Sequence, residues 1–318
     1  MINLNKRYTV GSLFAGIGGI DLAFQNVGCE ISWANEIDKK SCETYSHNFK
    51  HELICDDIKN LSSINNVDII TAGFPCQAFS IAGFRRGFED DRGLIFFDLL
   101  NIIKQIKPRI IFLENVKNLL SHDKGKTFQT IQDLLKIEGY FIKYQVLNTY
   151  KYSFLPQNRE RIYIICFRQE DDYNNFVFPS MVVSSNIKIA EFLEDNIAEE
   201  YYYKKQKFYS QLKEQMLNPD TCYQWRRHYL RENKNNLCPT LTANMGTGGH
   251  NVPLIVDKYD IRKLTPRECA RLQGFPDTFI LPSSVAKSIL YKQIGNSVSV
   301  PVVQSIAQNI IAAMQNRA

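Results

Sequence analysis

Residues 67–80 read VDIITAGFPCQAFS, an apolar run that ends in a glycine, a proline and a cysteine. The run from Val67 to Gly73 carries a single charge, at Asp68, and its apolar character predicts a strand buried on both faces of a parallel sheet. Ligands of open α/β sheets bind beyond the carboxyl ends of such strands. We therefore expect Cys76 at the edge of the sheet where a reacting group would stand.

Further runs of this kind occupy the chain as far as Phe167, namely TVGSLFAG, EISWANEI, RIIFLENV, FIKYQVLN and RIYIICF. The segments between them are helical in pattern, as in GLIFFDLLNIIKQIKP, where apolar residues recur at intervals of three and four. Strands that alternate with helices in this way predict an α/β fold with a doubly wound, mostly parallel sheet.

The periodic pattern weakens after Phe178–Pro179, where Asn, Tyr and Lys become frequent, and this change predicts a second, smaller domain. Helical patterning returns in LTPRECARLQGF and in PVVQSIAQNIIAAM, and the last helix is expected to pack on the first domain. The expected parts are a catalytic and cofactor-binding domain at 1–177, the second domain at 178–257, a connecting segment at 258–288 and a returning segment at 289–318.

The chain has 318 residues, 44% of them hydrophobic, and a formal net charge of +5, which permits a nucleic-acid partner without requiring one. No apolar run approaches ~20 residues, so we expect neither a membrane anchor nor secretion. The eight cysteines show no CxxC pair and no regular spacing, which argues against a disulfide framework and favours a reducing cytoplasm. A zinc site is not expected, because the one cluster of potential ligands matches no common zinc spacing: Cys42, His47, His51 and Cys55.

The first apolar run continues into FAGIGGID, Phe14–Asp21, where closely spaced glycines precede a helix. Such a turn lets a ligand approach the backbone, although a tight structural turn is an equally frequent use of the pattern. An acid at Asp21 replaces the third glycine of a dinucleotide site, which favours a nucleoside ligand without a diphosphate, such as S-adenosylmethionine. Glu36 and Asp57 follow two further strands, where carboxylates can accept hydrogen bonds from ribose hydroxyls and from an adenine amino group. Taken singly, each acid is more often a solvated loop residue.

The remaining candidates carry reactive or charged groups. The Cys76 thiolate is a nucleophile when amide dipoles or cations lower its pKa, whereas most free cysteines are structural. Glu114 interrupts the strand RIIFLENV, and a carboxyl so placed can act as a general acid or cap the next helix. Arg159 and Arg161 lie two residues apart and hence on one side of an extended segment. Arg161 can donate to a carbonyl oxygen while Arg159 holds the site together; a surface salt bridge is the alternative for either.

These motifs, in this order, resemble those of the DNA (cytosine-5)-methyltransferases of bacteria and phages. The resemblance rests on FAGIGG, FPCQAFS, ENV, QNRER, RKLTPRECARLQGFP and GNSV, and it spans nearly the whole chain outside 178–257. It implies that Cys76 attacks carbon 6 of a cytosine flipped out of DNA, that Glu114 hydrogen-bonds ring nitrogen 3 and the amino group, and that Arg161 holds the carbonyl at carbon 2. Carbon 5 then takes the methyl group of S-adenosylmethionine. The implied cofactor site comprises Phe14, Gly16, Ile17, Gly18, Glu36, Ile37, Asp57, Ile58, Pro75, Asn296 and Ser297.

The resemblance also implies residues that contact DNA. The segment AGFRRGFEDDRG matches the loop that closes over DNA in the family, so its arginines are expected to contact phosphates. The segment YQWRRHYLRENKNN interleaves aromatic and basic residues, a pattern suited to phosphates and guanine edges, or to a solvated basic face. The second domain is thereby expected to recognise the target. The expected DNA contacts are Gln77, Ser80, Arg85, Arg86, Arg92, Arg226, Arg227, Arg231, Thr240, Leu241, Gly248 and Gly249.

The resemblance implies a monomeric, cytoplasmic enzyme that acts on double-stranded DNA without a metal. A partner restriction endonuclease that recognises the same target is compatible with this function. Three alternatives remain open at this point. The branch of the family that methylates tRNA carries a Cys-Phe-Thr signature that is absent here. A catalytically silent DNA-binding protein would have no need of Cys76, Glu114 and Arg161. A nicotinamide-dependent oxidoreductase would require the third glycine.

Overall fold

The computed structural model describes residues 7–61, 64–75, 94–182, 187–226 and 229–315. The chain forms two compact units. Unit 1 comprises Met1–Leu147, Glu160–Ser180 and Val303–Ala318, and unit 2 comprises Asn148–Arg159 and Met181–Val302. Each unit therefore draws on segments that are far apart in the sequence.

Among the described residues, unit 1 is built on a seven-stranded sheet with the order β3-β2-β1-β4-β5-β8-β6. Its strands are β1 (Thr9–Leu13), β2 (Glu30–Asn35), β3 (Glu52–Ile54), β4 (Ile69–Ala72), β5 (Ile110–Val116), β6 (Phe141–Asn148) and β8 (Glu160–Phe167). β1 to β5 pair in parallel, whereas β8 runs antiparallel to β5. The strand order reverses at β1, with β2 on one side and β4 on the other, and such a switch point is where α/β proteins bind ligands.

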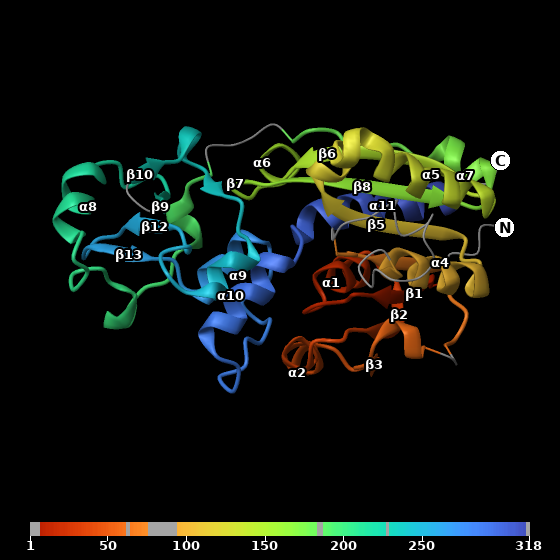
Figure 1. Ribbon diagram of the computed structural model, residues 1–318, viewed down its shortest axis with the longest axis horizontal. Coiled ribbons are helices and arrows are strands. Elements are labelled where there is room, and N and C mark those ends of the chain that lie inside the picture. The colour runs from red at the N-terminus through yellow and green to blue at the C-terminus, as the bar shows by residue number, and fades with distance from the viewer. Residues whose placement is uncertain (1–6, 62–63, 76–93, 183–186, 227–228, 316–318) are drawn as a thin grey trace. The chain divides into compact units, whose positions relative to one another are not determined.

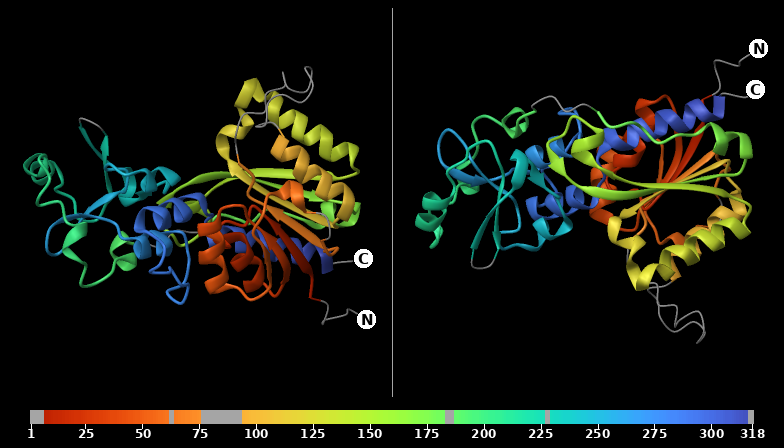
Figure 2. Two further views of the ribbon diagram at one scale, coloured as in Figure 1. Left: turned by 60° about the horizontal axis from the view of Figure 1, so that its bottom comes forward. Right: turned by 90° about the horizontal axis from the view of Figure 1, so that it is seen from above.

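Helices cover both faces of this sheet. They are α1 (Gly19–Asn26), α2 (Lys39–Asn48), α4 (Leu94–Ile106), α5 (Lys126–Ile137), α7 (Glu170–Asn175) and α11 (Val300–Gln315). Figure 2 shows α4 and α5 over one face and α1 and α11 over the other. Leu99 and Ile131 pack into the core under the first pair, and Phe24 of α1 meets Phe112 of β5 on the opposite face with ring centroids 5.5 Å apart. This double cover explains why β4 and β5 are apolar on both faces.

The apolar runs in the sequence correspond to β1, β2, β4, β5, β6 and β8, and the expected doubly wound, mostly parallel sheet is confirmed. β3 is not among these apolar runs, although Asp57 was expected to follow a strand at this position. This strand has three residues, and all of them are partly or fully exposed. A strand of three residues is too short to give a periodic signal.

Unit 2 contains, in its described part, a four-stranded sheet with the order β10-β9-β12-β13 and a two-stranded pair, β11-β7. Its strands are β7 (Gln157–Asn158), β9 (Tyr223–Arg226), β10 (Tyr229–Glu232), β11 (Cys238–Pro239), β12 (Leu254–Val256) and β13 (Ile261–Lys263). Its helices are α6 (Thr149–Tyr152), α8 (Tyr209–Gln215), α9 (Pro266–Leu272) and α10 (Lys287–Asn296). Leu212 of α8 and Met216, which directly follows this helix, form a small apolar core with Tyr223 and Leu254. Figure 1 labels α8 and the four strands of this sheet.

One helical stretch in the described residues, Lys287–Gln315, is long and apolar enough to cross a membrane by composition alone. It comprises α10 and α11, and 56% of its most apolar window is buried inside the protein. Ile306 and Ile310 of α11 are fully buried. This burial is typical of a core helix.

The motif RKLTPREC forms a buried ionic anchor within unit 2. The fully buried guanidinium of Arg262 donates to both carboxylate oxygens of Glu268, at 2.7 and 2.8 Å, and to Asp257 at 2.5 Å. Glu268 also accepts from the amide of Thr265 at 2.8 Å, and the Thr265 hydroxyl accepts from the amide of Glu268 at 3.1 Å, which caps α9. The motif thus joins β13 to α9 through one cation.

Replacing Arg262 with Met is expected to lower the free energy of unfolding by about 3–5 kcal/mol, because Glu268 and Asp257 would keep buried charges without their cation. Urea unfolding measures this loss. The control is Lys205→Met, since Lys205 is 87% exposed and pairs with an exposed Glu199, and it should cost less than about 1 kcal/mol. Equal losses in the two variants would show that Arg262 does not anchor the unit.

Candidate active site and cofactor site

The turn between β1 and α1 presents backbone amides at the switch point. Phe14, Gly16 and Gly18 all have positive φ, of 55°, 60° and 85°. At Gly18 a side chain is excluded both by φ and by the ring of Phe49, which would lie 2.2 Å from an added Cβ. At Gly16 an added Cβ would meet nothing within 4 Å, so this side of the turn is open to a ligand.

The carboxylate of Glu36 joins the first two loops of this edge. It accepts a hydrogen bond from the amide of Gly16 and another from the amide of Asp38, each at 2.8 Å. Glu36 follows β2 directly and is 9% exposed. Asp38 in turn caps α2 by accepting from the amides of Lys40 and Ser41 at 2.9 Å. A carboxylate has about four acceptor positions, so two amide bonds leave positions for ligand hydroxyls.

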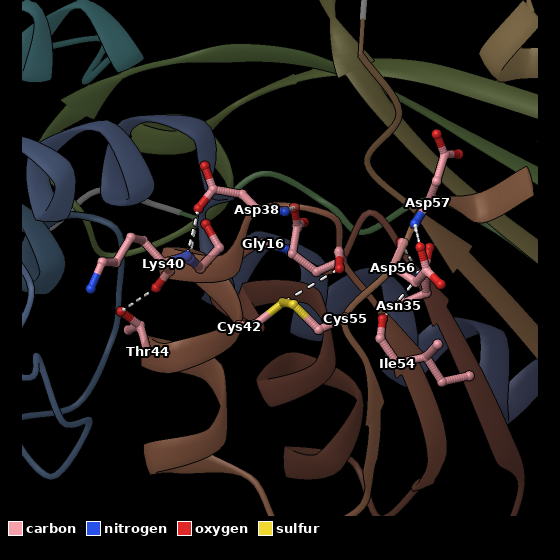
Figure 3. The surroundings of a disulfide bond; sticks show 12 residues. Gly16, Asn35, Asp38, Lys40, Cys42, Thr44, Ile54, Cys55, Asp56 and Asp57 are labelled. Carbon is pink, nitrogen blue, oxygen red and sulfur yellow. Dashed lines mark hydrogen bonds between the residues drawn. A yellow bond between two sulfur atoms is a disulfide. The ribbon is translucent and has the colours of Figure 1, made fainter. Parts of the chain in front are cut away.

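A third loop follows β3 and carries Asp56 and Asp57 (Figure 3). The side-chain amide of Asn35, at the end of β2, fixes this loop by donating to the carbonyl of Asp56 at 2.8 Å. Asp57 caps the 3₁₀ helix η1 (Ile58–Asn60), since its carboxylate accepts from the amide of Lys59 at 3.0 Å. The acids that the sequence suggested for ribose and adenine therefore lie on loops that are tied to one another.

Cys42 of α2 and Cys55 of this third loop form a disulfide, with Cα atoms 6.2 Å apart (Figure 3). The cysteine spacing, which argued against a disulfide framework, did not indicate this pair. Sequence spacing did not reveal it, because the two sulfurs meet only when α2 lies beside the loop that follows β3. Among the described residues, no group of three or more His, Cys, Asp or Glu side chains could hold a metal ion.

The disulfide closes a loop with a sequence separation of 13 residues, so its loss should lower the free energy of unfolding by about 3 kcal/mol. Urea unfolding of the oxidised protein and of Cys55→Ser, both without reductant, measures this difference. In dithiothreitol the two proteins should unfold at similar urea concentrations. Equal midpoints without reductant would contradict a stabilising disulfide.

The end of β4 leads to the segment of the expected nucleophile. Phe74 is buried, and its carbonyl accepts a hydrogen bond from the side-chain amide of Asn115 at 3.0 Å. Asn115, which the sequence did not single out, thereby fixes the backbone next to the exposed Pro75. Several expected site residues lie outside the described residues: Cys76, Gln77, Ser80, Arg85, Arg86, Arg92 and, in unit 2, Arg227.

An acid and a guanidinium meet beside the end of β4. Glu114 of β5 and Arg161 of β8 form an ion pair with 3.2 Å between Oε1 and Nε, and their side chains are 10% and 13% exposed. An added Cβ at Gly73 would lie 3.7 Å from Oε2 of Glu114, so this carboxyl adjoins the chain that leads to Cys76. The structure thus brings together two of the expected catalytic side chains at the carboxyl edge of the sheet.

Arg159 lies in unit 2, two residues before Arg161 of unit 1. Its guanidinium, 2% exposed, donates to the carbonyls of Leu241 at 2.7 Å, of Gly295 at 3.4 Å and of Ser297. The two arginines thus have different partners, each within its own unit. Arg159 acts as a buried anchor for the backbone of unit 2.

The dipeptide Thr240–Leu241 is held in the same part of unit 2. The Thr240 hydroxyl donates to the carbonyl of Asn158 at 2.7 Å, and the amide of Leu241 donates to the side chain of Gln157 at 3.3 Å. Leu241 is fully buried, so its side chain is not available for the DNA contact that the sequence suggested. Asn296, at the end of α10, is exposed.

The hairpin of β9 and β10 has one apolar and one polar face. Trp225 and Leu230 are cross-strand partners on the apolar face, where Trp225 stacks on Phe208 with ring centroids 4.4 Å apart. The polar face carries two further cross-strand pairs, because side chains alternate along a strand. These pairs are Gln224 with Arg231 and Arg226 with Tyr229.

The polar face is accessible and contains an internal hydrogen bond. Arg226 and Arg231 are exposed, and Arg226 donates to Oε1 of Gln224 at 3.1 Å. We call the four residues Gln224, Arg226, Tyr229 and Arg231 the hairpin face.

Gly248 and Gly249 form a loop near the same aromatic support. Their φ values are 83° and 64°, and an added Cβ at Gly248 would meet nothing within 4 Å. His250 packs edge-on against Phe208 at 4.7 Å, and Phe208 stacks on Trp225 of the hairpin. The glycine loop and the hairpin face are therefore supported by one aromatic cluster.

The sequence profile of the C-5 cytosine-specific DNA methylase family matches residues 8–312. The chain belongs to this family. It is accordingly a DNA cytosine-5 methyltransferase, as the order of its motifs suggested. This membership excludes the oxidoreductase alternative, and the family and the fold both imply S-adenosylmethionine as the methyl donor.

Relatives of this methyltransferase match over almost their full length. Type II methyltransferase M.Bsp6I of Bacillus sp. (strain RFL6) is 54% identical over 312 residues, which cover 96% of this chain and 99% of that protein. Type II methyltransferase M.HhaI of Haemophilus parahaemolyticus is 38% identical over 329 residues, covering 98% and 97%.

Solved structures resemble this methyltransferase in fold. A DNMT2 mutant from Spodoptera frugiperda has a TM-score of 0.75 at 20% identity, covering 96% of this chain and 99% of that chain. Dnmt2 of S. pombe has a TM-score of 0.75 at 21% identity, covering 97% and 99%. At such identities the likeness concerns the fold alone, and it agrees with the expected methyltransferase-type sheet.

Proposed function

We propose that this methyltransferase modifies carbon 5 of one cytosine within a short target in double-stranded DNA, as the modification enzyme of a bacterial restriction system. The observation that carries the proposal is the Glu114–Arg161 pair beside the end of β4, 3.2 Å apart and largely buried. A carboxyl group and a guanidinium together match the edge of a cytosine. The carboxyl group can bond ring nitrogen 3 and the amino group, and the guanidinium can donate to the carbonyl at carbon 2.

In this proposal the base is flipped out of the duplex to reach the pair. A hydrogen bond from the Glu114 carboxyl group to nitrogen 3 withdraws electrons from the ring and makes carbon 6 electrophilic. The Cys76 thiolate attacks carbon 6, and carbon 5 becomes nucleophilic. S-adenosylmethionine supplies a methyl group on a sulfonium. After carbon 5 is methylated, loss of its proton re-forms the double bond and expels the Cys76 thiolate.

The other cysteines leave Cys76 as the candidate nucleophile. Five of the eight are buried free thiols, and two form the disulfide. Burial raises the pKa of Cys29 to about 12 and also raises the pKa of Cys166, Cys238 and Cys269, so these four stay protonated. A protonated thiol is a poor nucleophile.

The residues at the switch point fit S-adenosylmethionine. The turn at Gly16 is open, Glu36 has acceptor positions for ribose hydroxyls, and Asp57 can accept from the adenine amino group. Ile37 is 62% exposed directly after Glu36, as a residue that stacks on a purine would be. Ile17 and Ile58 are buried and would support the turn and the third loop from behind. Phe14, Pro75, Asn296 and Ser297 complete the proposed site.

Replacing Cys76 with Ser should lower the rate of methyl transfer by several orders of magnitude, because a neutral hydroxyl is a much weaker nucleophile than a thiolate. Transfer of labelled methyl groups to duplex DNA measures the rate, while gel shift and calorimetry check that DNA and S-adenosylhomocysteine still bind. Normal methylation by the variant would show that Cys76 is not the nucleophile. Transfer to RNA but not to duplex DNA, in the wild type, would contradict the proposed substrate.

Glu114→Gln should slow methyl transfer about 10²–10⁴-fold, because a glutamine amide can hydrogen-bond to nitrogen 3 but cannot transfer a proton to it as a carboxyl group can. The matched control is Glu160→Gln on the neighbouring strand, where an exposed carboxylate pairs with Lys117 at 3.0 Å. That control should retain the wild-type rate. Single-turnover kinetics on one duplex compares the two variants. Equal rates would show that a group other than Glu114 hydrogen-bonds ring nitrogen 3 of the cytosine.

We further propose that the hairpin face recognises the target. Arginine pairs bidentately with guanine, and glutamine pairs with adenine, in the major groove. The glycine loop at Gly248 and Gly249 would approach the backbone of DNA closely. Thr240 and Leu241 would support this region from within unit 2, and Arg85, Arg86, Arg92 and Arg227 would add phosphate contacts.

Arg226→Ala and Arg231→Ala should each relax the target at one base pair, with a loss of about 1–3 kcal/mol in discrimination. The measurement is the methylation rate on duplexes that carry each single base-pair change of the target. Lys213→Ala, an exposed basic residue of α8, serves as the control. A uniform loss on all duplexes would identify phosphate contacts instead of base recognition.

The proposed cellular setting is the cytoplasm, where the enzyme acts as a monomer on genomic DNA without a metal ion. A cognate endonuclease would cut the same target when it is unmethylated. The Type II methyltransferases that resemble this chain support its place in a restriction-modification system.

A further inference from the structure

A buried carboxyl group lies beneath the glycine turn. Asp21, in the first turn of α1, is 0% exposed and accepts a hydrogen bond from the hydroxyl of Tyr45 at 2.6 Å. Burial raises the pKa of Asp21 to about 6, against the lowering effect of its bonds to Ser12 and Tyr45. The sequence suggested that Asp21 would repel a diphosphate bound at the turn. In the structure its carboxyl group is buried beneath the turn and does not reach the ligand side.

Tyr45 connects this carboxyl group to a histidine. Tyr45 lies on α2 and is 1% exposed, and its oxygen is 2.6 Å from Nε2 of His51. Since the phenolic proton is donated to Asp21, Nε2 of His51 must carry the proton of the second bond. Burial lowers the pKa of His51, which is consistent with a neutral ring. The chain of bonds thus runs from His51 through Tyr45 to Asp21.

This chain of bonds lies directly behind the cofactor turn. An added Cβ at Gly18 would lie 2.2 Å from the ring of Phe49 and 3.0 Å from that of Tyr45. The ring centroids of Tyr45 and Phe49 are 4.4 Å apart. Tyr45 of α2 and Phe49, which directly follows this helix, thus form an aromatic surface that packs against the turn. The opposite side of the turn, at Gly16, is open.

A purely apolar contact would not require these polar groups. Burying a carboxyl group and a phenol is unfavourable unless each is hydrogen-bonded, and the 2.6 Å bond between Tyr45 and Asp21 gives each of them a partner. The bond therefore fixes the position of α1 relative to α2. Because Gly18 caps α1, the same bond fixes the amides of the turn.

We propose that Asp21, Tyr45 and His51 are positioning residues for the methyl-transfer reaction, which hold the glycine turn in the geometry that binds the adenosyl cofactor. This inference rests on the proposed cofactor site. It assigns the three residues no contact with the cofactor or with DNA. Their effect is on cofactor affinity and not on the chemical step.

The first test is Tyr45→Phe, which removes one oxygen and keeps the ring that packs on Gly18. Calorimetry with S-adenosylhomocysteine should show about a ten-fold weaker Kd, the effect of one hydrogen bond to a charged group. The KM for S-adenosylmethionine should rise similarly, while kcat at saturating cofactor and the Kd for DNA stay within about two-fold. Tyr144→Phe is the control, because Tyr144 is 46% exposed and lies on β6 of the same unit.

The second test uses His51, where a conservative variant can restore the bond. His51→Ala should weaken S-adenosylhomocysteine binding, and His51→Gln should recover it, since a glutamine amide can donate to Tyr45 as Nε2–H does. An unchanged Kd in Tyr45→Phe, or equal losses of cofactor affinity, DNA affinity and kcat, would overturn the positioning role. A wild-type protein that binds DNA but no S-adenosylhomocysteine would instead overturn the proposed cofactor site, and this inference with it.

Discussion

The site depends first on the carboxylate of Glu36, which accepts hydrogen bonds from the amides of Gly16 and Asp38. These two bonds tie the loop after β1 to the loop after β2, on either side of the point where the strand order reverses. Asn35 extends the connection to the loop after β3 by its bond to Asp56. One acid and one amide thus hold three separate loops at the carboxyl edge of the sheet.

The side chains proposed to bind the cytosine depend on a second constraint, the antiparallel pairing of β8 with β5. This pairing brings Arg161 to Glu114 although the two residues are far apart in the sequence. Two residues earlier, Arg159 is committed to backbone carbonyls of unit 2. The motif QNRER thus spans the boundary between the units. Its Arg161 pairs with the carboxylate of Glu114, whereas its Arg159 holds the backbone that includes Leu241 and Ser297.

The sequence predicted those features of the fold and the site that depend on the residue types of one local segment. Apolar runs identified the longer strands, positive φ required glycine at Gly18, and the acids after β2 and β3 could be located from strand ends alone. Contacts between distant segments were not accessible in this way. The disulfide of Cys42 and Cys55 depends on how α2 lies beside a neighbouring loop, and the bond from Tyr45 to Asp21 depends on helix packing. For the same reason Leu241 was assigned to DNA although it is buried, and Asp21 was assigned to the ligand side of the turn although it lies beneath it.

We propose that the site at the carboxyl edge of this sheet methylates carbon 5 of cytosine in a defined DNA target. Bisulfite sequencing of genomic DNA from a methylation-deficient host that expresses the protein, or its Cys76→Ala variant, tests this claim most directly. The account predicts protected cytosines confined to one short motif, and none with the variant. Protection that persists with the variant, or no protection from a folded wild-type protein that binds S-adenosylhomocysteine, would contradict it.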